Sequence, residues 1–151
     1  MKKKNLVIIG VAVLVLVFGI LNVVWFAYSR SLKKYVKNIP EDGFGVYVTN
    51  DDAENSYSYR FPHYLQFIGN MALMDKDDNT LIIWTPMVGA KTYGVQLILE
   101  HNEIYEMFLD KDGNLIPDVN FHDAQGVYDE HRDIIQQLYR DAHEFWGNDF
   151  Y

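Results

Sequence analysis

The sequence predicts an α+β protein: an antiparallel β-meander sheet with a C-terminal helix packed on one face, preceded by a single N-terminal transmembrane helix. Three observations lead to this expectation. Residues 6–27 form a continuous apolar run, residues 43–110 contain short runs of alternating apolar and polar residues, and residues 127–146 change to a helical period. Strands joined by short polar turns pair as hairpins, and a helix that follows them covers one face of the sheet.

The apolar run reads "LVIIGVAVLVLVFGILNVVWFA", 22 residues in which Asn22 is the one polar member. At ~1.5 Å per residue a helix of this length spans ~33 Å, enough for the hydrocarbon core of a bilayer. Trp25 and Tyr28 stand where interfacial aromatic side chains are common. We therefore expect residues 1–29 to form a transmembrane anchor with a short basic N-terminus.

A cleaved signal peptide is the alternative interpretation of this segment. Lys2–Lys4 suit the basic start of a signal peptide, and Ala27-Tyr28-Ser29 suits a cleavage site. Apolar cores of signal peptides usually run ~7–15 residues, however, and this one is longer. The length favours an anchor that is not cleaved.

Charge divides the chain into two unlike parts. Residues 1–40 carry seven basic residues and no acid, whereas residues 41–151 carry all 21 acids and six basic residues, a net charge of −15. We expect residues 30–40 to be a basic juxtamembrane linker along the headgroups and residues 41–151 to be an acidic α+β binding domain. Such a domain repels nucleic acid and favours a basic protein as its partner. No cysteine is present, which excludes disulfides.

Membrane orientation does not follow from charge, because basic residues flank both ends of the apolar run. An acidic, aromatic-rich domain without cysteine, placed behind a signal-like start, favours an extracellular position. We therefore expect a single-pass protein of the cell membrane with its C-terminal domain outside the cell.

Six strands are expected from alternation and from the turn residues between them. The segment 63–74 contains a Gly69-Asn70 step, which indicates a bulge, and Pro62 marks a break before it. The expected strands are 43–50, 56–61, 63–74, 80–87, 91–100 and 103–110.

One helix is expected over residues 127–146, because apolar residues recur there every three to four positions. Asp123 is the expected N-cap and Gly147 the expected C-cap. This helix covers one face of the sheet. The other face is expected to be solvated and to carry many of the acids and tyrosines.

Two segments, "MDKDDNTLII" and "LDKDGNLIPD", begin with the Asp-x-Asp-x-Asn spacing of a calcium loop. Such a loop needs Gly at position six and Glu at position twelve. The first segment has Thr80 and Pro86 there, and the second has Leu115 and Phe121. Hairpin turns account for both segments better, because Asp, Asn and Gly tolerate the positive φ angles of tight turns.

Nothing in the sequence indicates catalysis, and we expect no enzyme, no cofactor and no metal site. The five histidines make no His-Glu-x-x-His or His-x-His pair, and no serine lies in a nucleophile-elbow context. A weak metal site near the expected helix start, and with it a metal-dependent hydrolase, stays open as an alternative; its residues would be His122, Asp123, Asp129 and His131.

Aromatic and acidic residues on a solvated sheet face suit protein binding better. Tyr offers a large contact area at low entropy cost, and carboxylates steer a basic partner. Alternation groups Tyr93 with Val95 and Leu97, so among the candidate tyrosines this is the one that the pattern most favours as a core residue. The candidate partner-binding residues are Tyr57, Tyr59, Tyr93, Glu100, Glu103, Tyr105 and Asp110.

Four stretches, together with the order of the segments, resemble the TipC-type immunity proteins of streptococci and relatives. The layout is a basic start, one anchor, an acidic β-rich domain and a helix that ends in Phe145-Trp146. The stretches are "FPHYLQFIGNMALMD" (61–75), "TPMVGAKTYGVQL" (85–97), "YEMFLDKDGNLIPD" (105–118) and "YDEHRDIIQQLYRDAHEFW" (128–146).

The resemblance implies a function. Such proteins are held on the outer face of the producing cell's membrane. They bind a secreted antibacterial toxin of the type VII system, of the LXG class, which acts on lipid II, and they neutralise it by occupying it. The alternative is a cell-envelope accessory protein whose anchored β-domain binds a membrane enzyme or wall component.

Overall fold

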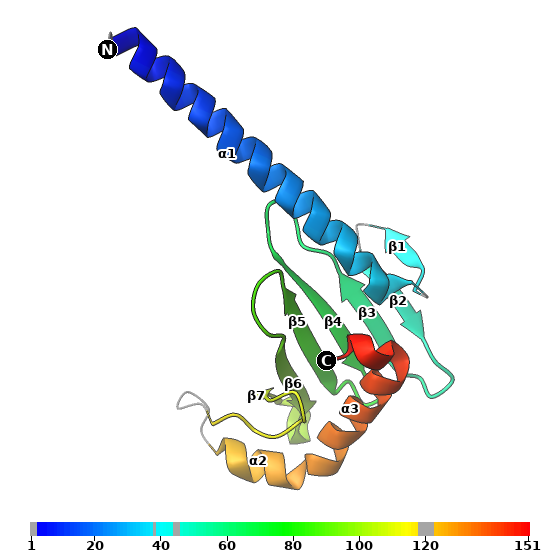
Figure 1. Cartoon of the computed structure of the whole chain (residues 1–151). Coiled ribbons are helices and arrows are strands. Elements are labelled where there is room, and N and C mark those ends of the chain that lie inside the picture. Colours follow the sequence, from blue (N-terminus) through cyan, green and yellow to red (C-terminus); the bar gives the residue numbers. More distant parts are fainter. Residues whose placement is uncertain (1–2, 38, 44–45, 118–122) are drawn as a thin grey trace.

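A computed structural model describes residues 3–37, 39–43, 46–117 and 123–151. It begins with one long helix, α1 (Lys3–Ser31), which continues into a short 3-10 helix, η1 (Leu32–Val36). Within the described residues, this is the one helical segment long and apolar enough to cross a membrane, spanning Val7–Val36. Figure 1 shows α1 projecting from the folded part of the chain and meeting it at its C-terminal end.

The sheet has seven antiparallel strands in sequence order, which confirms the expected meander. Each strand pairs with the next through a short connection. The strands are β1 (Glu41–Gly43), β2 (Val46–Asn50), β3 (Ser56–Arg60), β4 (Ile68–Met74), β5 (Thr80–Pro86), β6 (Thr92–Ile98) and β7 (Ile104–Leu109).

Two of the expected strands differ in extent. The expected strand 43–50 corresponds to β1 and β2, and its residues 44 and 45 lie outside the described residues. The expected strand 63–74 begins only at Ile68. Its first part is a turn instead, in which the Gln66 N–H donates to the His63 carbonyl at 2.8 Å and Leu65 has a φ of 58°. This connection, residues 61–67, is called the helix-side loop below.

The C-terminal helical segment is broken in two, so the single long helix that we expected is wrong in this respect. Helix α2 (Ala124–Glu130) and helix α3 (Arg132–Trp146) meet at His131, whose φ of −105° and ψ of 14° leave the helical range. Asp123 stands before α2 but makes no side-chain capping bond. Gly147 ends α3 with a φ of 57°, as a C-cap glycine does.

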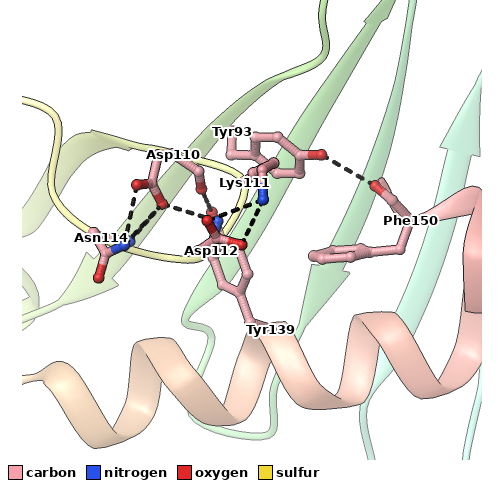
Figure 2. A network of polar contacts seen from close by, with 7 residues as sticks. All are labelled: Tyr93, Asp110, Lys111, Asp112, Asn114, Tyr139 and Phe150. Carbon is pink, nitrogen blue, oxygen red and sulfur yellow. Dashed lines mark hydrogen bonds and ion pairs between the residues drawn. The ribbon is translucent and has the colours of Figure 1, made fainter.

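Three hairpin turns share one design, in which an aspartate begins the turn and an asparagine ends it four residues later. In the turn of Figure 2, the Asp110 carboxylate accepts the N–H groups of Asp112 and Asn114 at 2.8 and 2.9 Å. Asp51 and Asp75 are held in the same way in the turns 51–55 and 75–79. The two Asp-x-Asp-x-Asn segments are therefore hairpin turns, as expected.

Alternation places the core on one face of the sheet, called the covered face below. Rings from the helices and from the strands meet there in pairs. Tyr35 of η1 stacks on Tyr59 with centroids 5.3 Å apart, and Phe145 of α3 stacks on Tyr57 at 3.9 Å. The end of α1, η1 and α3 therefore all lie on this face (Figure 1).

The expected linker, residues 30–40, contributes its described apolar side chains to this core, so it is not separate from the domain. Leu32, Tyr35, Val36 and Ile39 are all buried. The Trp146 indole N–H donates to the Tyr35 carbonyl at 3.3 Å, so α3 closes over η1. The four basic side chains of the segment stay on the surface or partly exposed, whereas its apolar side chains enter the domain.

Tyr28, in the last turn of α1, joins the helix directly to the sheet. Its hydroxyl donates to the Thr85 carbonyl of β5 and accepts the Gly69 N–H of β4 at 3.3 Å. The ring is 8% exposed.

Removal of residues 1–39 is expected to unfold the domain, because five buried apolar side chains are lost with it, each worth about 1.5–3 kcal/mol. Their sum is comparable to the whole stability of a small domain. A chain of residues 28–151 keeps all five: Tyr28, Leu32, Tyr35, Val36 and Ile39. Urea unfolding followed by near-ultraviolet circular dichroism compares the two. A cooperative transition in residues 40–151 as stable as in residues 28–151 would contradict the shared core.

Candidate binding surface

The face of the sheet opposite the core is covered by no described helix, and it is called the open face below. Its side chains come from the strand positions that alternate with the buried ones. They are Val46, Val48, Ser56, Ser58, Arg60, Ile68, Asn70, Ala72, Met74, Thr80, Ile82, Trp84, Thr92, Gln96, Ile98, Ile104, Glu106 and Phe108.

The open face is apolar, contrary to our expectation of acids and tyrosines. Among the eighteen side chains named above, Glu106 is the one acid and none is a tyrosine. Ile104 is 64% exposed and Ile68 is 56% exposed, and Met74 and Phe108 also count among the exposed apolar side chains. Monomeric proteins rarely expose contiguous apolar patches beyond a few hundred Å², and larger ones usually mark interaction sites.

A shallow pocket lies on this face over β5, β6 and the edge strand β7. Its volume is about 140 Å³, and Ile82, Trp84, Gly94 and Phe108 line it with Gln96 and Glu106. The Trp84 ring crosses Gly94 of the neighbouring strand, where an added Cβ would lie 2.9 Å from the ring. The glycine therefore lets Trp84 lie flat across β6, and Trp84 and Phe108 have centroids 6.1 Å apart.

Three of the predicted site residues, Tyr57, Tyr59 and Tyr93, are in the core, and their predicted place on a solvated face is wrong. They are at most 4% exposed. Each ring is buried because its hydroxyl finds a partner inside. Tyr57 donates to the Asp51 carboxylate at 2.8 Å, Tyr59 lies 3.2 Å from the Thr85 hydroxyl, and Tyr93 donates to the Phe150 carbonyl at 3.2 Å.

Two further predicted residues also contribute to the fold. Tyr105 pairs with Leu97 across the β6–β7 ladder and packs half-buried against the core. Asp110 directly follows β7, and its carboxylate accepts hydrogen bonds from the turn that it begins. The Tyr139 hydroxyl rises from α3 to donate to the Asp110 carbonyl at 2.9 Å (Figure 2). Both side chains therefore contribute to the fold.

Glu100 and Glu103 are exposed in the turn between β6 and β7. This turn directly follows Ile98 and precedes Ile104, which face each other on the open face. The two glutamates thus stand in the turn at one end of the open face, where they line a pocket of about 370 Å³ together with Val127, Glu130 and His131 of the helical segment. They are the predicted site residues that the structure leaves exposed.

The described carboxylates form no metal centre, because no group of three His, Asp or Glu side chains is arranged to hold an ion within the described ranges. His122 of the alternative metal site lies outside those ranges. Asp129 accepts the Gln125 amide at 2.9 Å, and a His131 ring nitrogen lies 3.0 Å from the Val127 carbonyl.

Apolar positions on both sides of the strands were the signal for a second interaction surface. In β5 the odd positions Leu81 and Ile83 enter the core, and the even positions Ile82 and Trp84 line the open face. Strands with apolar residues on both faces are usually covered on both faces. Where the chain's own helices cover only one face, a partner is expected to cover the other. Because we expected the tyrosine side chains on the solvated face, we predicted no apolar surface there.

Comparison with protein-family models finds no match for this chain, and comparisons with curated proteins and with solved structures find none either. The binding surface is therefore inferred from the geometry of the chain itself.

Asp110→Ala is expected to destabilise the protein by about 1–2 kcal/mol at neutral pH, because two turn N–H groups and the Asn114 amide lose their acceptor. Burial alone would raise the pKa of Asp110, but the hydrogen bonds from Asn114 and Asp112 outweigh it and lower the pKa. A carboxyl with a lower pKa in the folded state stabilises the fold above its unfolded pKa, near 4, and this contribution disappears as the pH falls through the folded value.

The stability difference between wild type and Asp110→Ala should therefore shrink as the pH falls below the unfolded pKa of about 4. Urea unfolding at a series of pH values measures it. Asp112→Ala is the matched control, since this residue of the same turn makes only an exposed ion pair with Lys111. A pH-independent difference for Asp110→Ala, or an equal loss for Asp112→Ala, would contradict the role of Asp110.

Proposed function

We propose that this protein is a membrane-anchored binding protein whose open face holds a partner protein, and that the partner is a cognate secreted toxin which it neutralises by occupancy. The observation that carries the proposal is the open face itself, an apolar sheet surface with exposed Ile68, Ile104 and Phe108 around a shallow pocket. A surface of this kind supplies binding energy when a partner covers it.

The acids have a separate part in this proposal. The folded domain is strongly acidic, yet the open face carries little of that charge, and Glu100 and Glu103 stand in the turn at one end of it. An apolar centre with charge at the periphery is typical of protein interfaces, in which rim charges speed association and the centre sets the lifetime of the complex. A basic partner surface is the electrostatic complement.

An anchor that stays attached is supported by the packing of Tyr28. Cleavage after Ser29 would remove this residue, whose ring is buried and whose hydroxyl bonds β4 and β5. A signal peptide is normally removed without loss of core residues, so the contact favours a permanent membrane helix. The extracellular side is proposed from the acidic, cysteine-free domain behind a signal-like start.

The identity of the partner rests on the resemblance to TipC-type immunity proteins. It points to a toxin of the type VII, LXG class that acts on lipid II, produced by the same cell. The cell-envelope accessory protein remains the second candidate, because the same apolar surface would equally hold a membrane enzyme.

A pull-down separates these candidates. The full chain in a non-ionic detergent is the bait, and captured proteins are identified by mass spectrometry at low and moderate salt. A secreted toxin-like protein among secreted proteins of the same strain supports the proposal. Capture of a membrane enzyme from solubilised envelopes supports the accessory protein. Self-association of the bait through the open face, seen by analytical ultracentrifugation, would overturn both.

Ile104→Asp is expected to weaken partner binding at least tenfold, because it places a charge in the apolar interface. Ile134→Asp on α3 is the matched control, since it changes an exposed isoleucine that is not on the open face. Binding is measured by biolayer interferometry on the full chain in detergent. If both variants bind like wild type, the open face is not the binding surface.

Glu103→Lys is expected to act mainly on association. Removal of a rim carboxylate from a steered encounter lowers the on-rate and reduces its salt dependence, with little change of the off-rate. Association rates at 50 and 300 mM salt measure the effect, and Lys76→Glu in the 75–79 turn gives the opposite change of charge. An unchanged salt dependence for both variants would refute electrostatic steering.

A further inference from the structure

A pocket of about 720 Å³ lies beside the last turn of α1, on the side of the domain where the chain leaves the apolar helix. Tyr28, Ser31 and Tyr35 line one wall, and the connection between β5 and β6 lines the other. None of the open-face side chains named above lines this pocket, which reaches the open face only at Pro86, so the two sites are distinct.

The charge of this pocket is opposite to that of the domain. Three lysines line it, Lys34, Lys91 and Lys111, and no Asp or Glu side chain does so among the described residues. Lys111 is paired with Asp112 outside the lining at 2.8 Å, so Lys34 and Lys91 are the lysines that matter here. The ammonium groups of Lys34 and Lys91 converge on one ring, at 4.7 and 5.1 Å from the Tyr35 centroid. The two positive charges repel each other, and an anion between or beside them would offset this repulsion.

Carboxylates compensate this pair only in part. Lys34 forms an ion pair with Asp149 at 2.6 Å, whereas Lys91 donates only to the Asp149 main-chain oxygen. Lys91 is half-buried, and burial together with the nearby Lys34 lowers its pKa to about 8. A bound anion would offset both the burial of the Lys91 ammonium group and its repulsion by Lys34. It balances the positive charge and accepts hydrogen bonds from the remaining N–H groups.

The pocket also lies at the level of lipid headgroups if α1 spans a membrane. Tyr28 and Ser31 follow the interfacial Trp25 by three and six residues, ~5 and ~9 Å along the helix. The headgroup layer is ~5–8 Å thick on each side of the hydrocarbon core. The helix-side loop marks the same level, because its His63 carbonyl accepts the Trp25 indole N–H at 3.1 Å and its Tyr64 packs on the Trp25 ring.

The lip of the pocket is apolar. Met87 and Val88 in the β5–β6 connection are exposed, Val88 by 79%, and Met87 lines the pocket. Apolar side chains next to a cationic pocket suit the boundary between headgroups and acyl chains, where both parts of a lipid are within reach.

We propose that this pocket binds an anionic phosphate group at the membrane surface, through the ammonium groups of Lys34 and Lys91. Two sources of such a group exist, the headgroup of an anionic phospholipid and free phosphate. The lipid source rests on the membrane anchor of the proposed function, whereas the anion site itself does not.

Native mass spectrometry of the full chain released from detergent micelles tests the inference. The protein is titrated separately with phosphatidylglycerol, with phosphatidylcholine and with inorganic phosphate. Wild type is expected to retain one phosphatidylglycerol, and Lys91→Gln to bind it about tenfold more weakly or worse, the usual loss for a charge-assisted contact. Lys91→Arg keeps the charge and should retain the lipid, and Lys76→Gln is the control for an exposed lysine remote from the pocket.

Equal retention of phosphatidylglycerol by wild type and Lys91→Gln would overturn the proposal, as would equal retention of phosphatidylglycerol and phosphatidylcholine. Inorganic phosphate that binds wild type as tightly as the lipid assigns the site to free phosphate and overturns the lipid source. Thermal melting of each variant shows whether it is folded. Partner capture through the open face is measured on the same variants. The anion site and the partner surface are therefore tested independently of each other.

Discussion

The packing of the last turn of α1 against the sheet is the contact on which the rest of the structure depends. Tyr28 bonds β4 and β5 through its hydroxyl, and Tyr35 stacks on Tyr59 while Trp146 bonds its carbonyl. The apolar helix and the sheet therefore share one core. A long helix that enters a domain in this way fixes the orientation of the domain, because residues 28–36 pack directly against the sheet and α3.

This constraint also decides how the two faces of the sheet are used. The helices cover one face completely, and the aromatic residues that looked suitable for a binding surface are needed there as core. The other face is left with isoleucine, methionine, tryptophan and phenylalanine and with little charge. Exposed apolar area of this kind is costly in water, so a covering partner is the simplest reason for its presence. The proposed function gives that partner a chemical description.

The regular features of the fold could be predicted from sequence because local chemistry determines them. The apolar run, the alternation of the strands and the Asp and Asn residues of the turns each act within a few residues. The face of the sheet occupied by Tyr57, Tyr59 and Tyr93 could not be predicted in the same way. It depends on partners far away in the sequence, such as Thr85 and Phe150, that satisfy the hydroxyls. The folding of residues 30–40 into the core depends likewise on Trp146 and Tyr59.

Hydrogen–deuterium exchange of the full chain in phospholipid nanodiscs tests most directly whether the helix and the sheet form one cooperative unit. The account predicts that the amides of residues 28–36 exchange as slowly as those of β4 and β5 and become labile together with them when urea is added, since they share one core. Fast exchange of residues 28–36 while β4 and β5 stay protected would show a flexible linker instead. That result would contradict both the fixed orientation of the open face and the placement of the lysine pocket at the membrane.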